Sequence, residues 1–219
     1  ECYLELMKRV ALSAIVVSAV LSFGVPAGSE ESIKGREILG LRIGGIHSTS
    51  GLDEAFGSGT ELEIYFYHGL TTSSALGISL SGHDFGKSKL PEKDLEFLGI
   101  PESIDYMIYA LTGCFMMKRD VSKKIRLSGE LGGGLYTSTS SIPMGGVSEG
   151  RITHNHPGVY AGGEIWWRLT KGGIHLGLGG KWHYVFTGTD YRQPVYVFTG
   201  EENAHFFQIT IGISFKTDE

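Results

Sequence analysis

Two histidines separated by one residue, His154 and His156, form the most concentrated group of side chains that could do chemistry. Imidazoles at positions i and i+2 share one face of an extended segment and can bind a metal ion if a third ligand is near. That third ligand could be His83, Asp53 or His205. This spacing is a weak metal signature, so we expect no metal site and no bound cofactor.

Catalysis by a nucleophile is the second possibility. Some barrel enzymes that modify lipids bring a serine, a histidine and a carboxylate or amide together near one rim. Serines and histidines are present here, but no motif places a nucleophile beside its base, so we expect no enzyme. Cys114 is the only cysteine after Met7. It therefore has no disulfide partner in the mature chain, and we interpret it as a packing residue.

Charged residues recur on one face of several segments with a two-residue period. The positive members are Arg42, Arg126, Arg168 and Lys181, and the negative members are Glu61, Glu63, Glu130 and Glu164. Buried charges are tolerated when they are paired, and equal numbers of the two signs favour pairing. Counted from a tight turn at Thr170–Gly173, Glu164 lies diagonal to Lys181 on the next strand. We interpret the set as a structural polar plug, with a selectivity or gating network as the alternative.

The elements that carry these charges are segments in which apolar and polar residues alternate. Alternation with a period of two predicts β-strands that have one apolar and one polar face. The eight predicted strands are Ile38–His47, Thr60–His68, Ala75–Phe85, Ile104–Met117, Ile125–Tyr136, Val159–Leu169, Ile174–Tyr184 and Phe206–Phe215. Glycines on the polar face are expected to make room for Tyr65, Tyr67, Tyr160 and Trp166.

The gaps between these segments alternate in length. Short gaps lie near Gly69–Ser74, Lys118–Lys124 and Thr170–Gly173. Long gaps lie near Ser48–Gly59, Gly86–Ser103, Thr137–Pro157 and Thr187–Asn203. One rim with short turns and one with long loops is typical of a transmembrane barrel. We therefore predict an all-β fold, an eight-stranded antiparallel up-and-down transmembrane β-barrel with the charged face toward the lumen.

A soluble sandwich or a lipocalin-like barrel would show the same period. Two features favour the membrane. The apolar face continues through all eight segments, and aromatic residues near segment ends would suit the two interfaces of a bilayer. The aromatic residues assigned to such a girdle are Tyr65, Tyr67, Phe85, Tyr136, Tyr184, Phe186, Phe206 and Phe215.

The N-terminal part of the chain has the pattern of a secretory signal peptide. Lys8 and Arg9 precede the apolar run Val10–Phe23, and Ala27 ends a plausible cleavage site. A membrane anchor or a buried helix is the alternative, and Met7 is the expected start. The expected organisation is residues 1–27 as upstream extension and cleaved signal, 28–37 as a short lead, and 38–216 as a single barrel domain.

The composition fits one ordinary domain. The 219 residues carry a net charge of −5, which gives no sign of a nucleic-acid partner. The mean hydropathy is zero. That value suits barrel strands, because only every second residue of such a strand meets lipid.

The stretch from Gly158 to Phe215 resembles the small outer-membrane β-barrel superfamily, which includes the outer-membrane protein A, W and X types. The resemblance rests on a glycine-rich strand, a strand ending in RLT, a tight turn, a strand ending in aromatic residues, and a last strand ending in GISF. It extends more weakly back to Ile38. It implies a monomer in the bacterial outer membrane, surrounded by lipid, with a structural or interaction role through extracellular loops. A narrow channel, or lateral passage of small apolar molecules, is the alternative, and a lipid-modifying enzyme is third.

Overall fold

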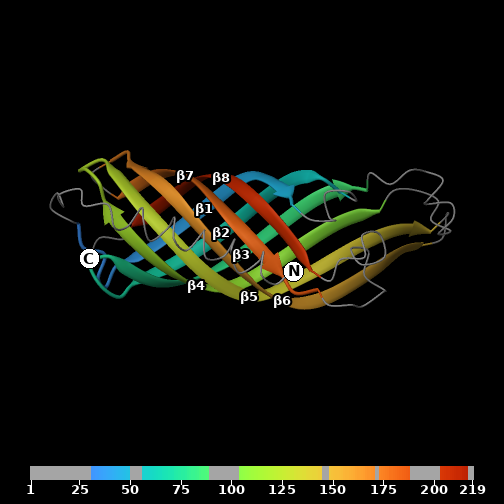
Figure 1. The fold of residues 1–219 in the computed structure, drawn as a ribbon. Coiled ribbons are helices and arrows are strands. Elements are labelled where there is room, and N and C mark those ends of the chain that lie inside the picture. Colours follow the sequence, from blue (N-terminus) through green and yellow to red (C-terminus); the bar gives the residue numbers. More distant parts are fainter. Residues whose placement is uncertain are drawn as a thin grey trace, which may run out of the picture.

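The strands of this chain form a closed antiparallel barrel (Figure 1). The computed structural model describes residues 31–49, 56–88, 104–144, 148–170, 173–187 and 203–216. The strands are β1 (Glu37–Ser48), β2 (Ser58–Gly69), β3 (Ser74–Lys87), β4 (Asp105–Asp120), β5 (Ile125–Met144), β6 (Ser148–Arg168), β7 (Ile174–Val185) and β8 (Ala204–Lys216). Each strand pairs with its neighbours in sequence, and β8 returns to pair with β1. The predicted eight-stranded up-and-down barrel is confirmed.

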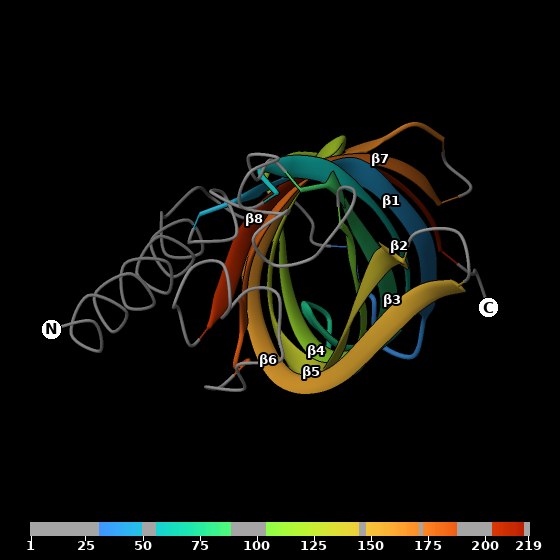
Figure 2. The same cartoon turned by 90° about the vertical axis from the view of Figure 1, so that its right-hand side faces the viewer.

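The two faces of the sheet lie as the alternation predicts. On the outer face Ile43 is 65% exposed and Ile78 is 59% exposed, whereas Tyr65 on the inner face is 1% exposed. The same alternation holds around the whole ring, which Figure 2 shows nearly end-on. An apolar surface that encircles the molecule, over an interior that contains many polar and charged side chains, differs from a soluble barrel and suits contact with hydrocarbon. No helix among the described residues is long and apolar enough to cross a membrane.

The two rims differ in the way their connections are built. At one end, called the turn rim here, lie the β2–β3, β4–β5 and β6–β7 turns together with the start of β1 and the end of β8. The opposite end is called the loop rim. Gly173, in the β6–β7 turn, has φ 83°, a conformation that favours glycine.

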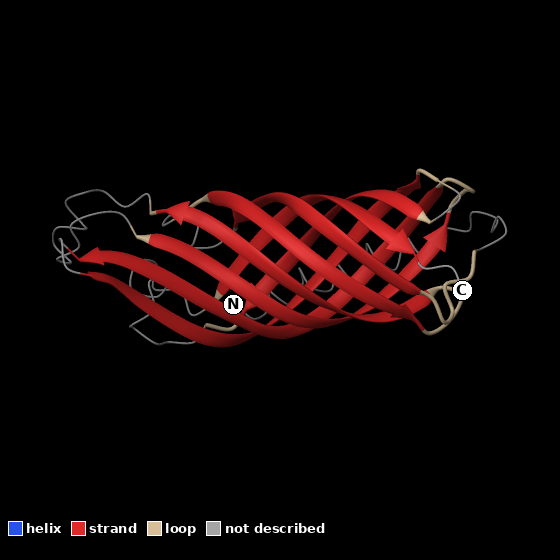
Figure 3. Ribbon diagram, turned by 180° about the vertical axis from the view of Figure 1, so that it is seen from behind, coloured by secondary structure: helices blue, strands red, loops and turns tan. Residues whose placement is uncertain are grey.

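The predicted loop near Thr137–Pro157 is wrong. β5 and β6 continue through it as strands of 20 and 21 residues, and they stay paired as far as Met144 and Ser148. β7 pairs with β6 only up to Gly158, opposite Val185, so the β5–β6 hairpin extends beyond the loop rim (Figure 3). Among the described residues, the outward positions of this part, such as Thr137, Thr153 and Asn155, are polar, so the alternation of hydropathy that marks the other strands disappears.

The girdle assignment is wrong for five of its eight aromatic residues. Those that point into the barrel and are buried are Tyr65, Tyr67, Phe85, Tyr136 and Phe206. Their positions have the parity of the inner face, and that parity decides their direction more strongly than nearness to a strand end. Tyr184, Phe186 and Phe215 lie on outer-face positions, and the Tyr184 and Phe186 rings are in contact.

Candidate functional site

The barrel interior is filled because small residues lie opposite large ones. A Cβ atom on Gly40, Gly77, Gly132 or Gly177 would overlap an aromatic ring on the same or a neighbouring strand. The rings concerned are those of Tyr65, Tyr67, Tyr160 and Trp166, so the expectation that glycines make room for these four residues is confirmed. Gly179, opposite Glu164, and Gly162, opposite Lys181, make room in the same way for charged side chains.

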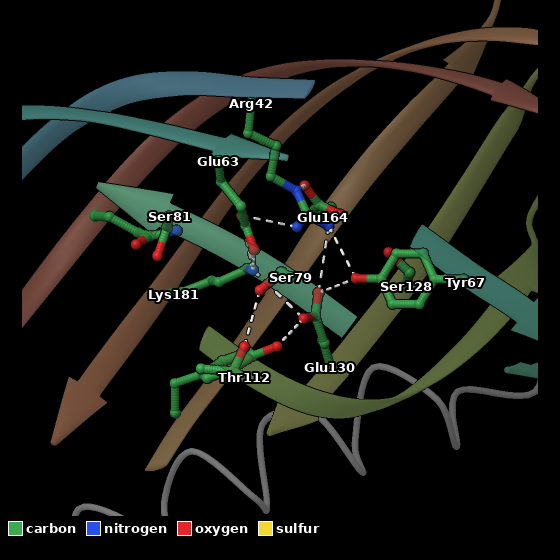
Figure 4. A network of polar contacts seen from close by, with 12 residues as sticks. Arg42, Glu63, Tyr67, Ser79, Ser81, Thr112, Ser128, Glu130, Glu164 and Lys181 are labelled. Atoms are coloured by element: carbon green, nitrogen blue, oxygen red, sulfur yellow. Dashed lines mark hydrogen bonds and ion pairs between the residues drawn. The ribbon is translucent and has the colours of Figure 1, made fainter. Parts of the chain in front are cut away.

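Arg42 on β1 is the centre of the interior ion network (Figure 4). Its Nε donates to Glu164 Oε1 at 2.6 Å, its Nη1 to Glu63 Oε2 at 2.9 Å, and its Nη2 to Glu130 Oε2 at 3.2 Å. The residue is 1% exposed, so these bonds replace its hydration. One guanidinium therefore joins carboxylates from β2, β5 and β6.

Lys181 on β7 joins two of the same carboxylates from the other side. Its ammonium donates to Glu63 Oε1 at 2.7 Å and to Glu130 Oε1 at 3.3 Å. Glu130 also accepts from the Tyr67 hydroxyl at 2.6 Å and from the Tyr160 hydroxyl. The network thus crosses the lumen and connects five strands.

The structure separates the eight predicted network residues into three places. Arg42, Lys181, Glu63, Glu130 and Glu164 lie in the central network. Glu164 is diagonal to Lys181 in the register, because Lys181 pairs with Gly162 and Glu164 with Gly179, but each side chain bonds to other partners.

The remaining three predicted residues lie outside the central network. Arg126 and Arg168 are at the turn rim, where Arg126 Nε donates to Asp120 Oδ1 at 2.7 Å and Arg168 contacts Glu31. Glu61 is 3% exposed, and its carboxylate oxygens have no hydrogen-bond partner among the described residues. The four-to-four charge balance therefore does not hold in the centre of the barrel.

Toward the loop rim, the network is covered by an aromatic and histidine layer. The His183 ring stacks on Phe206 with centroids 4.7 Å apart, and its Nε2 lies 2.7 Å from Gln208 Oε1. Above it, a buried cluster from several strands fills the lumen, and it includes Phe56, Phe85 and Tyr106. Toward the turn rim, a second buried cluster surrounds Tyr65, Tyr67 and Trp166.

The candidate metal ligands do not form a site among the described residues. His154 and His156 are on β6, with ring centroids 6.1 Å apart, and they belong to a strand where a loop was expected. His83 packs inside against Phe206, while His205 stacks on Tyr184 at the outer face. The described part of the chain contains no group of three metal-binding side chains, and Asp53 lies outside it. Cys114 is a buried free thiol.

Little space remains in the interior that the structure describes. Below Tyr65 and Trp166, toward the turn rim, lies a cavity of about 20 Å³. Such a volume holds about one ordered water molecule. Side chains occupy the lumen at every level between this cavity and the Phe56 cluster, as expected for a barrel of eight strands.

The sequence prediction missed three parts of this interior. Asp120, inside the predicted short gap Lys118–Lys124, is the anionic partner of Arg126, and Glu31 is the partner of Arg168. The hydroxyls of Tyr67 and Tyr160 complete the coordination of Glu130. Asp120 lies two residues after Lys118 on β4, so both belong to the inner face, and this spacing could have identified Asp120 as an inward residue. The alternation of the strands gives no information about Glu31, because Glu31 precedes the first strand.

Comparison with known proteins supports the fold. No family model matches the chain, and no curated protein matches it. Solved structures do: Neisserial surface protein A has a TM-score of 0.54 at 15% identity, over 84% of this chain and 98% of that one. A major outer membrane protein from Thermus thermophilus has a TM-score of 0.54 at 11% identity, over 83% and 99%. The outer membrane protein OprG from Pseudomonas aeruginosa has a TM-score of 0.51 at 12% identity, over 87% and 99%. The chain has the fold of these small outer-membrane barrels.

Proposed function

We propose that this chain is a monomeric, non-enzymatic protein of the bacterial outer membrane, a rigid barrel that presents a binding surface at its loop rim. The observation that carries the proposal is the combination of an apolar outer belt with a lumen filled by side chains. A barrel filled in this way has lipid as its surroundings and no open path for solutes. Its turn rim would face the periplasm and its loop rim the cell exterior.

The β5–β6 hairpin is the element best placed to make contacts outside the membrane. Thr153 and Asn155 are exposed on its outer face, and the Thr137 hydroxyl donates to Asn155 Oδ1 at 2.7 Å. β6 has no pairing with β7 before Gly158, while β5 remains paired with β4 to Ser141. The hairpin is therefore a paired, projecting structure on a rigid base, and such a base is where binding segments commonly reside.

Removing the tip of this hairpin is expected to abolish binding at the loop rim, measured as attachment of cells, without unfolding the barrel. In the variant, an Asn-Gly turn replaces residues 142–150, so the Ser141–Arg151 pair becomes the new hairpin end. Cells that produce the full chain or the variant are compared for surface attachment and for cell–cell sedimentation. The control is equal amounts of heat-modifiable protein in the outer-membrane fraction. Equal attachment of both strains, with equal amounts of folded protein, contradicts the interaction role.

The filled lumen predicts little conductance. The purified protein in a planar bilayer should show no steady current above that of the bare membrane, because the ion network and the two buried clusters block the lumen. The control is a barrel of known conductance inserted under the same conditions. A large, stable current from the unaltered protein would support the narrow channel instead.

A further inference from the structure

The segment before β1 folds into the mouth of the barrel at the turn rim. Ile33 is completely buried, and its backbone N–H donates to Thr72 O at 3.3 Å. Gly35 N–H donates to Gly69 O at 2.8 Å, and Gly35 has φ 73°. Glu31 N–H donates to Asp120 Oδ2 at 2.9 Å. This segment, residues 31–36, is called the lead below.

The carboxylate of Glu31 lies among cations from the end of the barrel. It contacts Lys216 and Arg168, and it lies 3.7 Å from Arg126 Nη2 and 3.6 Å from Arg36 Nη1. Lys216 is 6% exposed and Arg126 is 8% exposed. Cations withdrawn from water to this degree need an anionic partner. Asp120 pairs with Arg126 at 2.7 Å, and Glu31 supplies the second negative charge of this cationic pocket, the one in contact with Lys216 and Arg168.

An apolar site lies directly beside this cationic pocket. Ile33 belongs to the same buried cluster as Tyr65, Tyr67, Met116 and Trp166. The cavity of about 20 Å³ is lined by those four residues and reaches Arg126 and Lys216. The lead thus presents one carboxylate and, two residues later, one branched apolar side chain to a mouth that has a cationic part and an aromatic part.

We propose that the mouth at the turn rim is a binding site for small amphipathic carboxylates, molecules with one carboxylate on an apolar body, and that Glu31 and Ile33 occupy it as an internal ligand. The carboxylate of such a molecule takes the place of Glu31 beside Lys216 and Arg126, and its apolar body takes the place of Ile33 in the buried cluster that includes Tyr65 and Trp166. This site is at the opposite end from the β5–β6 hairpin, so it is independent of the binding surface proposed at the loop rim.

The lead is suited to be displaced because its attachment is limited. It joins the barrel through a few backbone hydrogen bonds, the Glu31 contacts, a bond from Lys118 to the Glu31 carbonyl and one buried side chain, that of Ile33, and Gly35 gives the chain a turn just before β1. As a tethered ligand it competes at a high effective concentration. Weakening it should therefore increase the apparent affinity for an external carboxylate.

The test uses 4-phenylbutyrate and its neutral analogue 4-phenylbutyramide as probes, with the full mature chain in detergent or nanodiscs. Isothermal titration calorimetry compares the unaltered protein with Glu31→Gln and with Glu31→Gln/Ile33→Ser. We expect the double variant to bind 4-phenylbutyrate about tenfold more tightly than the unaltered protein, and about tenfold more tightly than it binds the amide. The single variant serves the same comparison if the double variant does not fold.

A matched pair of lysine variants locates the site. In the Glu31→Gln background, Lys216→Gln should weaken 4-phenylbutyrate binding, whereas Lys123→Gln, at an exposed position of the β4–β5 turn, should leave it unchanged. The proposal is overturned if folded Glu31→Gln protein, judged by heat-modifiable mobility, does not bind the acid. It is equally overturned if the acid and the amide bind alike, or if the two lysine variants have the same effect.

Discussion

Arg42→Met is expected to lower the free energy of unfolding by about 3–5 kcal/mol, the range measured when one partner of a buried ion network is removed. Methionine fills a similar volume but leaves Glu63, Glu130 and Glu164 with Lys181 as the only cation that bonds to the network in the described interior. Because Glu164 is hydrogen-bonded through both carboxylate oxygens to Arg42, it loses the most. Reversible urea unfolding in liposomes, followed by gel mobility, measures the change.

Two further variants separate the loss of the network from a general loss of packing. Arg42→Met/Glu164→Gln should cost less than the sum of the single changes, because both single changes remove the same two hydrogen bonds between Arg42 and Glu164. Arg168→Met removes an arginine whose side chain is 31% exposed at the turn rim. Its effect should stay within about 1 kcal/mol, as for surface ion pairs. Additive costs for Arg42 and Glu164 would show that the two residues are not coupled.

The architecture of the barrel could be predicted because contact with lipid restricts which residues can occupy the outer face of each strand. Every outer position in the belt must be apolar, so Leu76, Ile78 and Leu80 on β3 identify a strand and its outer face together. Beyond the belt this restriction does not apply, and the alternation of apolar and polar residues stops. The part of the β5–β6 hairpin beyond the belt is made mainly of polar residues, such as Ser138 and Thr153, so its sequence has the pattern of a loop.

The pairing of the lumen charges could be predicted only between adjacent strands. Register gives the position of Glu164 relative to Lys181, since β6 and β7 are joined by a short turn. The bonds that form instead cross the lumen: Arg42 to Glu130 spans 88 residues of sequence, and Lys181 to Glu63 spans 118. Contacts across a narrow barrel depend on the stagger of the strands and on the positions of the glycines that face each side chain. The alternation of apolar and polar residues gives no information about either.

The membrane itself can be tested with one outward residue. Ile211 is 57% exposed at the middle of the outer face of β8, with Phe207 and Phe215 toward the two ends of that face. Its cross-strand neighbours, Ile43 and Leu178, are also exposed apolar residues. Aromatic residues at both ends of an apolar stripe suit the two interfaces of a bilayer, which places Ile211 near the midplane.

Ile211→Arg should therefore make folding into liposomes less favourable by about 2–4 kcal/mol, the cost of an arginine on the lipid face of a barrel near the midplane. Thr153→Arg is the matched control, because Thr153 is equally outward on β6 but lies on the hairpin beyond the end of β7. It should change the free energy by no more than about 1 kcal/mol. In a water-soluble barrel both changes would place arginine on a hydrated surface, and neither would be costly. Equal, small effects of the two substitutions would thus contradict a lipid-facing belt, whereas a large difference between them requires hydrocarbon around β8 and none around the hairpin.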